Sequence, residues 1–214
     1  MSEKKKLLLI GGGGHCKSVI PIIEETLEYE IVGISDKQEN LNKKILKHSI
    51  IITDKELEKY DKKANYAFIT LGSIKNAKKR ENLYSKLKQI GYHFPIIQSK
   101  HSIISKYSNI EEGTVIMPGV VINPGVTIGK NCIINTGSII EHDCKIDDHT
   151  HIAPGVTISG GVRIGKCSHI GTGTTIIQNI EITENCIIGA ASLVLKDISD
   201  PGIYYGIPTK KGRK

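Results

Sequence analysis

The sequence of 214 residues contains no tryptophan and only two phenylalanines, but it contains 22 glycines. A core with so few aromatic rings has to be built from many small and β-branched side chains. No stretch approaches the roughly 20 apolar residues that a membrane-spanning helix needs. The basic run Lys4–Lys6 precedes only the short apolar stretch Leu7–Ile10, well below the roughly 7–15 apolar residues of a secretory signal. We therefore expect a cytoplasmic protein with no membrane insertion.

Paired cysteines are also missing. None of the five cysteines belongs to a Cys-x-x-Cys pair, which argues against a zinc ribbon and against a dithiol redox motif. The formal net charge is +7, and part of it lies at the two ends of the chain. Because no basic patch alternates with aromatic residues, we expect no nucleic-acid binding and interpret most lysines as solvated surface.

The second half of the chain carries a six-residue repeat. Every sixth residue from Ile104 to Ile188 is isoleucine, and Val194 follows in the same register. The third residue after each isoleucine is often Gly or Asn, which tolerate the positive φ of a tight corner, and the fourth is small or β-branched. The apolar period is six rather than 3.6, which excludes a helix. The pattern predicts a left-handed parallel β-helix with three hexads in each triangular coil of about 18 residues.

Residues 1–98 lack this repeat and alternate between strand and helix patterns. Such alternation predicts a small Rossmann-like α/β domain with a parallel sheet. We therefore expect two domains, 1–98 and 99–214, with the β-helix and a C-terminal tail in the second. The expected strands are 6–10, 29–35, 48–53 and 66–71, and the expected helices are 15–27, 54–60 and a third that ends near residue 90.

A run of glycines, Gly11–Gly14, follows the first expected strand. Such a loop exposes backbone N–H groups at a helix N-terminus, which suits a phosphate. It fails the dinucleotide fingerprint, because Lys17 occupies the place of the third glycine. The phosphates of a nucleotide sugar fit better, and Asp36 lies where it would accept hydrogen bonds from a base or ribose. A tight turn without a ligand is the alternative.

Transfer of an acyl group from a thioester to an amine or hydroxyl needs a base for the proton of the acceptor. His142 lies between Glu141 and Asp143 on the outer surface of the expected β-helix. A carboxylate that bonds one ring nitrogen fixes the tautomer and leaves the other nitrogen as a base. The alternative is a surface histidine in a charged loop. His151 and His169 are separated by three hexads, which stacks them on one face in successive coils.

Two other classes of function compete with acyl transfer. Some β-helices hold zinc through three histidines, but His142, His149 and His151 have spacings of seven and two, which form no standard ligand pair. We therefore expect no metal. A β-helix that acts only as a scaffold is the other alternative.

Four segments together resemble the nucleotide-sugar N-acetyltransferases of the hexapeptide-repeat family. This family includes the bacillosamine-pathway and perosamine acetyltransferases, and the sialic acid O-acetyltransferases are close relatives. The resemblance covers essentially the whole chain, and its most specific parts are the GGGGH loop and the EHDC segment. The segments are GGGGH after the first strand, LGS at 71–73, INTGSIIEHDC at 134–144 and HIAPG at 151–155.

The resemblance implies a homotrimer that binds acetyl-CoA between neighbouring subunits and acetylates the 4-amino group of a nucleotide-linked amino sugar in surface glycan biosynthesis. His142 would be the general base and Asp143 would orient it. A sialic acid is the alternative acceptor. The residues implied at the acetyl-CoA site are His151, Gly160, Thr172, Ala190, Pro208 and Lys210. Those implied at the nucleotide-sugar site are Gly12, Gly13, Gly14, His15, Asp36, Gly72 and Arg80.

Overall fold

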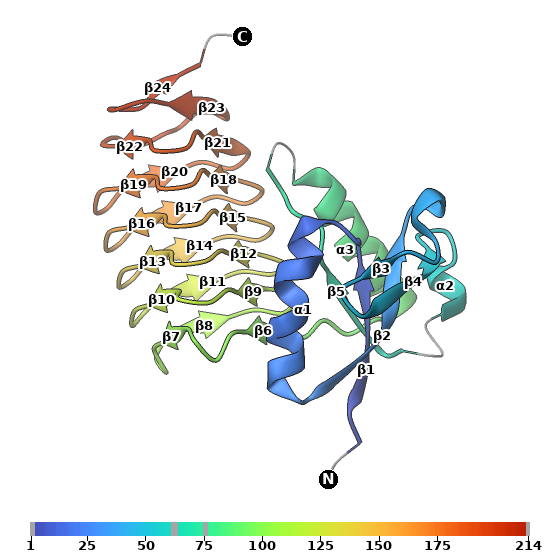
Figure 1. The fold of residues 1–214 in the computed structure, drawn as a ribbon. Helices are drawn as coiled ribbons and strands as arrows, with labels where there is room; N and C mark the ends of the chain where they lie inside the picture. Colours follow the sequence, from blue (N-terminus) through green and yellow to red (C-terminus); the bar gives the residue numbers. More distant parts are fainter. Residues whose placement is uncertain (1–2, 61–63, 75–76, 213–214) are drawn as a thin grey trace. The chain divides into compact units, whose positions relative to one another are not determined.

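The computed structural model describes residues 3–60, 64–74 and 77–212 (Figure 1). The chain divides into two compact units. The first, here the N-terminal unit, contains the chain up to Gly72 together with Lys79–Lys100. The second, here the β-helix unit, contains Ser73–Lys78 and the chain from His101 onward. A single boundary at residue 98 therefore misses the short segment Ser73–Lys78, which groups with the β-helix.

The N-terminal unit is built on a five-stranded sheet with the order β3-β4-β2-β1-β5. Four strands are parallel, and β3 pairs antiparallel with β4 at one edge. The chain moves from β1 through β2 to β4 on one side and then returns to place β5 on the other side of β1. The strands are β1 (Lys5–Ile10), β2 (Tyr29–Asp36), β3 (Lys44–Ile45), β4 (His48–Thr53) and β5 (Tyr66–Ile69), with β6 (Ile97–Gln98) following later.

Helices complete this unit. They are α1 (Gly14–Thr26), the 3-10 helix η1 (Gln38–Asn40), α2 (Leu57–Tyr60) and α3 (Lys78–Ile90). Leu7–Ile10 of the central strand β1 are fully buried, as expected for a parallel strand covered on both faces. Leu8 and Ile10 pack in one cluster with Tyr84 and Leu87 of α3. This is the Rossmann-like arrangement that the sequence predicts.

Helix α2 is shorter than expected. The N–H and hydroxyl of Thr53 both donate to Glu56, at 2.9 and 2.8 Å. Asp54 accepts a hydrogen bond from Ser35. These side chains organise a turn ahead of the helix, which therefore begins at Leu57 rather than at residue 54.

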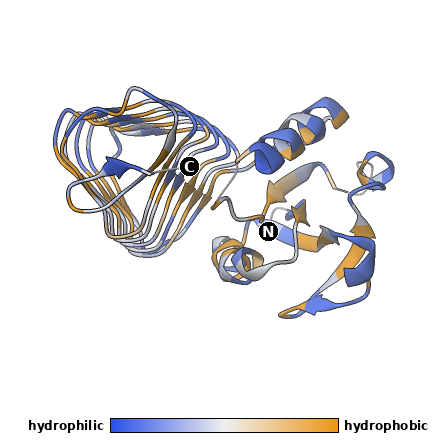
Figure 2. Ribbon diagram, turned by 90° about the horizontal axis from the view of Figure 1, so that it is seen from above, coloured by the Kyte–Doolittle hydropathy of each residue, from blue (hydrophilic) through white to orange (hydrophobic). Residues whose placement is uncertain are grey.

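The β-helix unit consists of short parallel strands that form three sheets. Each strand pairs with the strand three hexads further along the chain, as β10 does with β13 through Ile122 and Ile140. Seen from above, the coils superpose on a triangular outline (Figure 2). The three sheets are called the first, second and third sheet below. The first contains β7 (Ile103–Ile104), β10 (Val121–Ile122), β13 (Ile139–Ile140), β16 (Thr157–Ile158), β19 (Thr175–Ile176) and β22 (Leu193–Val194).

The second and third sheets follow the same step of one coil as far as β21 (Cys186–Ile188). The second contains β8 (Asn109–Ile110), β11 (Thr127–Ile128), β14 (Lys145–Ile146), β17 (Arg163–Ile164) and β20 (Glu181–Ile182). The third includes β9 (Val115–Ile116), β12 (Ile133–Ile134), β15 (His151–Ile152), β18 (His169–Ile170), β21 (Cys186–Ile188), β23 (Gly202–Tyr205) and β24 (Lys210–Lys211). Beyond β21, β23 pairs with β21 at a shorter offset and β24 pairs antiparallel with β23. The parallel β-helix expected from the repeat is therefore present.

The repeat accounts for the interior of the β-helix. The isoleucines at the repeating position are buried from Ile116 through Ile188. The small residue four positions later is buried as well, and three of these residues are cysteines: Cys132, Cys144 and Cys186. All five cysteines are unpaired thiols. Those three thiols therefore fill the core.

Every corner from Gly113 to Ala191 has positive φ at the third residue after the repeating isoleucine. Gly and Asn hold most of these positions, as expected. The other residues are Asp143, His149, Cys167 and Ala191, with φ between 53° and 61°. The paired strands on both sides impose the corner on these residues, although their side chains disfavour it.

Candidate functional site

His142 and Asp143 form a hydrogen-bonded pair at a corner of the β-helix. They lie between β13 and β14, where the first sheet meets the second. Nδ1 of His142 lies 2.8 Å from Oδ2 of Asp143. A carboxylate only accepts, so Nδ1 carries the proton and Nε2 of the neutral ring has a free lone pair. The two side chains are 64% and 72% exposed, which leaves the imidazole accessible to an acceptor group. The carboxylate contact expected from the sequence is therefore present, and Asp143 provides it.

Gly160 lies one coil beyond His142, at the same corner. The N–H of Gly161 donates to the carbonyl of His142. Thr172 and Ala190 occupy a different corner, between the third sheet and the first, where the N–H of Ala191 donates to the carbonyl of Thr172. Both residues are exposed. The structure therefore places the residues expected around acetyl-CoA at two corners of one chain, separated by the first sheet.

His151 lies on β15 in the third sheet, on the far side of the coil from the corner of His142. Its side chain is buried. Nδ1 donates to the carbonyl oxygen of Ser73 at 2.7 Å, and Nε2 accepts from Nδ2 of Asn135 at 3.3 Å. These contacts fix the ring. One chain therefore does not bring His151 next to His142.

His169 stacks against His151 as their spacing of one coil predicts. The two strands pair in register, and the ring centroids are 4.8 Å apart in an edge-to-face arrangement. Burial lowers the pKa of His169, and the backbone of Ser73 opposes this shift. The two imidazole rings therefore lie side by side on the third sheet.

Most of the residues expected at the nucleotide-sugar site gather at the carboxyl edge of the N-terminal sheet. They lie around β1 and β5, where the strand order reverses, which is the usual ligand crevice of such sheets. Gly11 has a φ of 106° and packs against Leu71. Gly13, Gly14 and Gly72 have neither a positive φ nor such a neighbour, because a Cβ added at any of them would meet nothing within 4 Å. Their backbone is therefore open to a ligand.

Helix α1 begins at this edge without a side-chain cap, since Gly13 occupies the N-cap position. Uncapped N–H groups at a helix start favour an anion. Asp36, at the end of β2, accepts from the N–H groups of Gly12 and Lys37, each at 2.6 Å, and from Asn40 at 3.3 Å. Burial raises the pKa of Asp36, but these hydrogen bonds outweigh it and the net shift is downward. An ionised Asp36 therefore holds the glycine loop.

His15 and Arg80 lie inside this unit. Burial and the charge of Arg80 lower the pKa of His15 to about 4. Nε2 of His15 is buried and has no hydrogen-bond partner among residues 3–60, 64–74 and 77–212. Arg80 is only 1% exposed, and its Nη1 donates to the carbonyls of Ile69 and Leu71 at 2.6 and 2.8 Å. Arg80 therefore holds the segment that follows β5. The family resemblance implied a contact with the nucleotide sugar and did not indicate this structural contact.

Pro208 and Lys210 lie at the C-terminal end of the β-helix and are exposed. Lys210 pairs with Tyr205 across the antiparallel strands β23 and β24. The N–H of Thr209 donates to the carbonyl of Leu193. The tail therefore caps the last coils.

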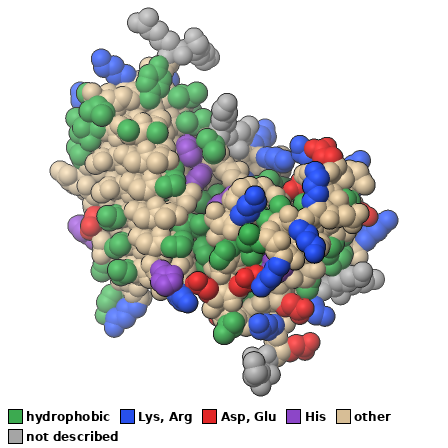
Figure 3. Space-filling model, viewed as in Figure 1, with side chains coloured by type: hydrophobic (Ala, Val, Ile, Leu, Met, Phe, Trp, Pro, Cys, Tyr) green, Lys and Arg blue, Asp and Glu red, His purple; other side chains and the backbone are tan. Residues whose placement is uncertain are grey.

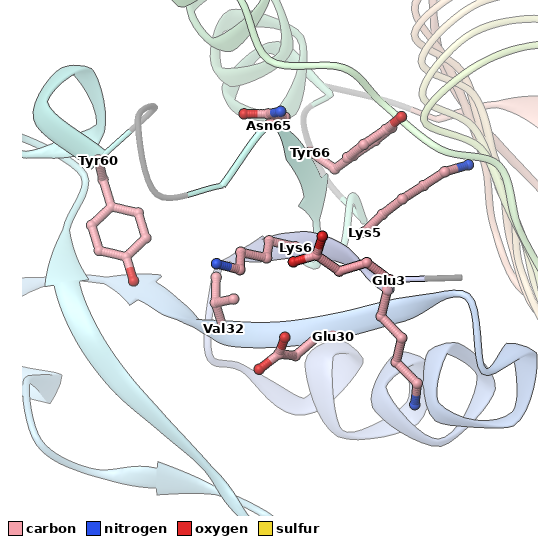
Figure 4. Close-up of a pocket in the computed structure, with 9 residues that line it drawn as sticks. Glu3, Lys5, Lys6, Glu30, Val32, Tyr60, Asn65 and Tyr66 are labelled. Atoms are coloured by element: carbon pink, nitrogen blue, oxygen red, sulfur yellow. The ribbon is translucent and has the colours of Figure 1, made fainter. Parts of the chain in front are cut away.

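A separate depression of about 730 Å³ lies at the amino ends of the strands of the N-terminal sheet (Figure 4). Lysines and glutamates share its lining, and Lys5 lies over the rings of Tyr29 and Tyr66 at 5.7 and 5.6 Å. It is at the opposite end of the strands from the glycine loop. We therefore assign it no part in the site.

Charged side chains gather over the N-terminal unit and are sparse over the β-helix in the face that Figure 3 shows. Within the described ranges, no three His, Cys, Asp or Glu side chains form a group that could hold a metal ion. No helix among the described residues is long and apolar enough to cross a membrane.

Sequence reasoning did not single out Ser73 and Asn135, which hold His151. Asn135 lies inside the INTGS motif, but its contact with a histidine of the next coil depends on the coil geometry. Ser73 is 78 residues from His151, and no periodicity links the two. Gly125, which lies against Asp143, was also missed.

Comparison with known families matches residues 6–87 to the PglD N-terminal domain and residues 107–141 and 130–160 to the bacterial transferase hexapeptide repeats. A comparison with curated proteins gives no significant match. Among solved structures, the chain is similar to a histidine variant of perosamine N-acetyltransferase from Caulobacter crescentus in complex with CoA and GDP-perosamine. The identity is 27%, the TM-score is 0.92, and 98% of this chain and 97% of that chain are covered.

The chain is also similar to the acetyltransferase domain of PglB from Neisseria gonorrhoeae in complex with acetyl coenzyme A. The identity is 26%, with a TM-score of 0.90 over 98% of this chain and 100% of that domain. WeeI from Acinetobacter baumannii, at 24% identity and a TM-score of 0.84 over 97% and 100% of the two chains, shares the fold. These matches confirm the Rossmann-like domain, the left-handed β-helix and the family resemblance. The chain therefore combines a PglD N-terminal domain with bacterial transferase hexapeptide repeats, the arrangement of the CoA-dependent sugar N-acetyltransferases to which it is similar.

Proposed function

We propose that this enzyme transfers the acetyl group of acetyl-CoA to the 4-amino group of a nucleotide-linked amino sugar. His142 acts as the general base and Asp143 orients it. The product is an N-acetylated sugar nucleotide, which suits a glycosyltransferase step in surface glycan assembly. The relatives in complex with CoA, acetyl coenzyme A and GDP-perosamine support both substrates.

The observation that carries this proposal is the hydrogen bond between His142 and Asp143. It holds the proton on Nδ1, so the lone pair of the exposed imidazole lies on Nε2. The lone pair of the sugar amine attacks the thioester carbonyl carbon, and Nε2 takes the proton that the nitrogen loses. The C–S bond then breaks, the amide forms, and the sulfur leaves with a proton as the free thiol of CoA. No covalent enzyme intermediate is needed.

The carboxyl edge of the N-terminal sheet supports a nucleotide sugar as acceptor. Gly13, Gly14 and Gly72 leave backbone open there, and helix α1 begins without a side-chain cap. The buried Nε2 of His15 has no partner among the described residues. A diphosphate would satisfy the N–H groups of the helix start, and its charge suits the end of the helix dipole.

The arrangement of the β-helix supports a homotrimer with acetyl-CoA between subunits. His142 and Gly160 lie at one corner, and Thr172 and Ala190 lie at another. A groove between two subunits would present one group from each chain to the same ligand. The first sheet, which lies between these corners, has an outward column without charge that a neighbouring subunit would bury. The column is Ile103, Val121, Ile139, Thr157, Thr175 and Leu193.

Thiol release from acetyl-CoA, measured against a panel of acceptors, tests the reaction. The panel contains UDP-, GDP- and dTDP-linked 4-amino sugars, together with free and CMP-linked sialic acids. We expect rapid turnover with one amino sugar. Turnover with a sialic acid alone would replace the proposal with O-acetylation. The absence of turnover together with a failure to bind acetyl-CoA would reject the function.

Light scattering tests the assembly separately. We expect a particle of three subunits. A particle with the mass of a single chain would reject the interfacial site but not the acetyl transfer itself.

A further inference from the structure

Gly160 breaks the pattern of the corners. It occupies the second position after a repeating isoleucine, the same position as His142. In every other hexad from Ile104 to Ile188 this position holds a residue with a side chain, and Ala190 and Thr172 are two examples. The corner itself therefore accepts side chains at this position.

The backbone of Gly160 does not require glycine either, since its φ lies outside the positive range in which side chains are strained. Glycine is required instead because there is no space for a side chain at position 160. A Cβ at position 160 would lie 2.6 Å from Nε2 and 2.7 Å from Cε1 of His142. Real Cβ contacts are essentially never this short, so the imidazole ring of His142 occupies the place where a side chain would be.

Gly125 lies against Asp143 in the same way as Gly160 lies against His142. It lies at the same corner as Asp143, in the preceding coil. A Cβ there would overlap Oδ1 of Asp143. The carboxylate therefore rests over Gly125 while the imidazole rests over Gly160.

We infer that Gly125 and Gly160 are positioning residues for the His142–Asp143 pair, and this inference rests on the proposed function. The pair is well exposed, so its two side chains would sample several rotamers if nothing bounded them. The two glycines, one coil before and one coil after, form a slot that fits the ring and the carboxylate in one arrangement. A misplacement of about 1 Å is sufficient to cost as much as 100-fold in rate.

The test adds one methyl group with Gly160→Ala. We expect kcat to fall about 10-fold or more, because the ring has to move away from the added Cβ. The thermal midpoint should stay near that of the wild type, since alanine is native at this position in Ala190. An unchanged kcat would overturn the inference.

The same substitution in a His142→Ala background is the matched control. Without the imidazole the methyl group has room, so we expect the double variant to have the same residual rate as His142→Ala alone. Equal costs in both backgrounds would show that Gly160 acts independently of His142, for example through acetyl-CoA, and would reject the assignment.

Gly125→Ala is compared with Gly137→Ala. Both glycines have positive φ, 77° and 67°, so the backbone strain is matched, but a Cβ at Gly137 would meet nothing within 4 Å. We expect similar losses in thermal midpoint, with a lower kcat only for Gly125→Ala. Equal kcat values would remove Gly125 from the assignment.

The imidazole resonances of His142, followed by NMR at a fixed pH, provide a measurement that does not depend on turnover. We expect Gly160→Ala and Gly125→Ala to shift these resonances, and Gly137→Ala to leave them unchanged. If the wild type acetylates nothing, the proposed function fails, but the shifts still test the slot. If the enzyme is active and the resonances stay fixed, the slot alone is rejected.

Discussion

In the β-helix unit, residues one coil apart in sequence are neighbours, so His142 lies over Gly160 and His151 stacks on His169. In the N-terminal unit, Gly12 meets Asp36 only because β1 and β2 are parallel neighbours and a loop happens to end there. The contacts between coils follow from the spacing of residues in the sequence. The contact in the N-terminal unit depends on the tertiary fold.

The two units also stabilise their polar groups differently. In the β-helix, the N–H and C=O groups of each coil bond those of the next, and the pair His142–Asp143 lies at the surface. In the N-terminal unit, a buried guanidinium satisfies carbonyls at the end of a strand and lies near a buried imidazole. Substitutions in the β-helix pair should therefore affect rate, and substitutions of the buried guanidinium or the buried imidazole should affect stability.

Arg80→Ala is the largest expected disruption of the N-terminal unit. It leaves the carbonyls of Ile69 and Leu71 without a buried donor, which should cost roughly 3 kcal/mol of unfolding free energy. Thermal unfolding followed by circular dichroism should show an early transition in the variant, while the β-sheet signal of the coils persists. A single transition at the wild-type midpoint would contradict the structural role of Arg80.

His142→Ala should lower kcat about 100-fold or more, since a general base contributes about 10²–10⁴. The side chain is exposed, so the thermal midpoint should not move. Calorimetric titration should show that acetyl-CoA still binds. Near-normal turnover would reject His142 as the base.

His15 should make the stability of the N-terminal unit depend on pH. Its pKa of about 4 in the folded state lies below the ordinary value of 6.5. The unfolded chain therefore binds the proton first, and stability is full above pH 6.5 and is lost as the pH falls toward 4. Between pH 7 and pH 5 the loss should be about 1–2 kcal/mol. Urea unfolding of His15→Asn should show a smaller loss over this range than the wild type, and equal slopes would contradict the assignment.

Asp36→Ala is the mildest change. Loss of the carboxylate frees the N–H of Gly12 and loosens the glycine loop, so KM for the sugar substrate should rise about 10-fold, equivalent to about 1.4 kcal/mol. KM for acetyl-CoA should change less. Initial rates with each substrate varied in turn measure both constants, and the reverse pattern would place the nucleotide site elsewhere.

The sequence predicts the β-helix almost completely because each hexad repeats the same local rule. The isoleucine positions, the small inward residues and the stacking of His151 on His169 all follow from the period. The positive φ of Cys167 and Ala191 does not, because these residue types rarely adopt it and the neighbouring coils impose it.

Much less of the candidate site follows from local patterns. The GGGGH loop marks the carboxyl edge of the sheet, but the burial of Arg80 depends on how α3 packs. Ser73 reaches His151 from a segment that no repeat connects to it. The positions of Gly125 and Gly160 carry a signal only when the coils are aligned on one another.

The stacking of coils also fixes the distances between side chains along the axis of the β-helix. Neighbouring parallel strands are about 4.8 Å apart, so the height of any side chain along the axis is quantised in steps of one coil. Gln178 lies two coils beyond His142 at the same corner, which corresponds to about 10 Å. An extended substrate arm laid along that corner therefore has its length set by the number of hexads. Evolution can change that length only by adding or removing whole coils, which keeps every column in register.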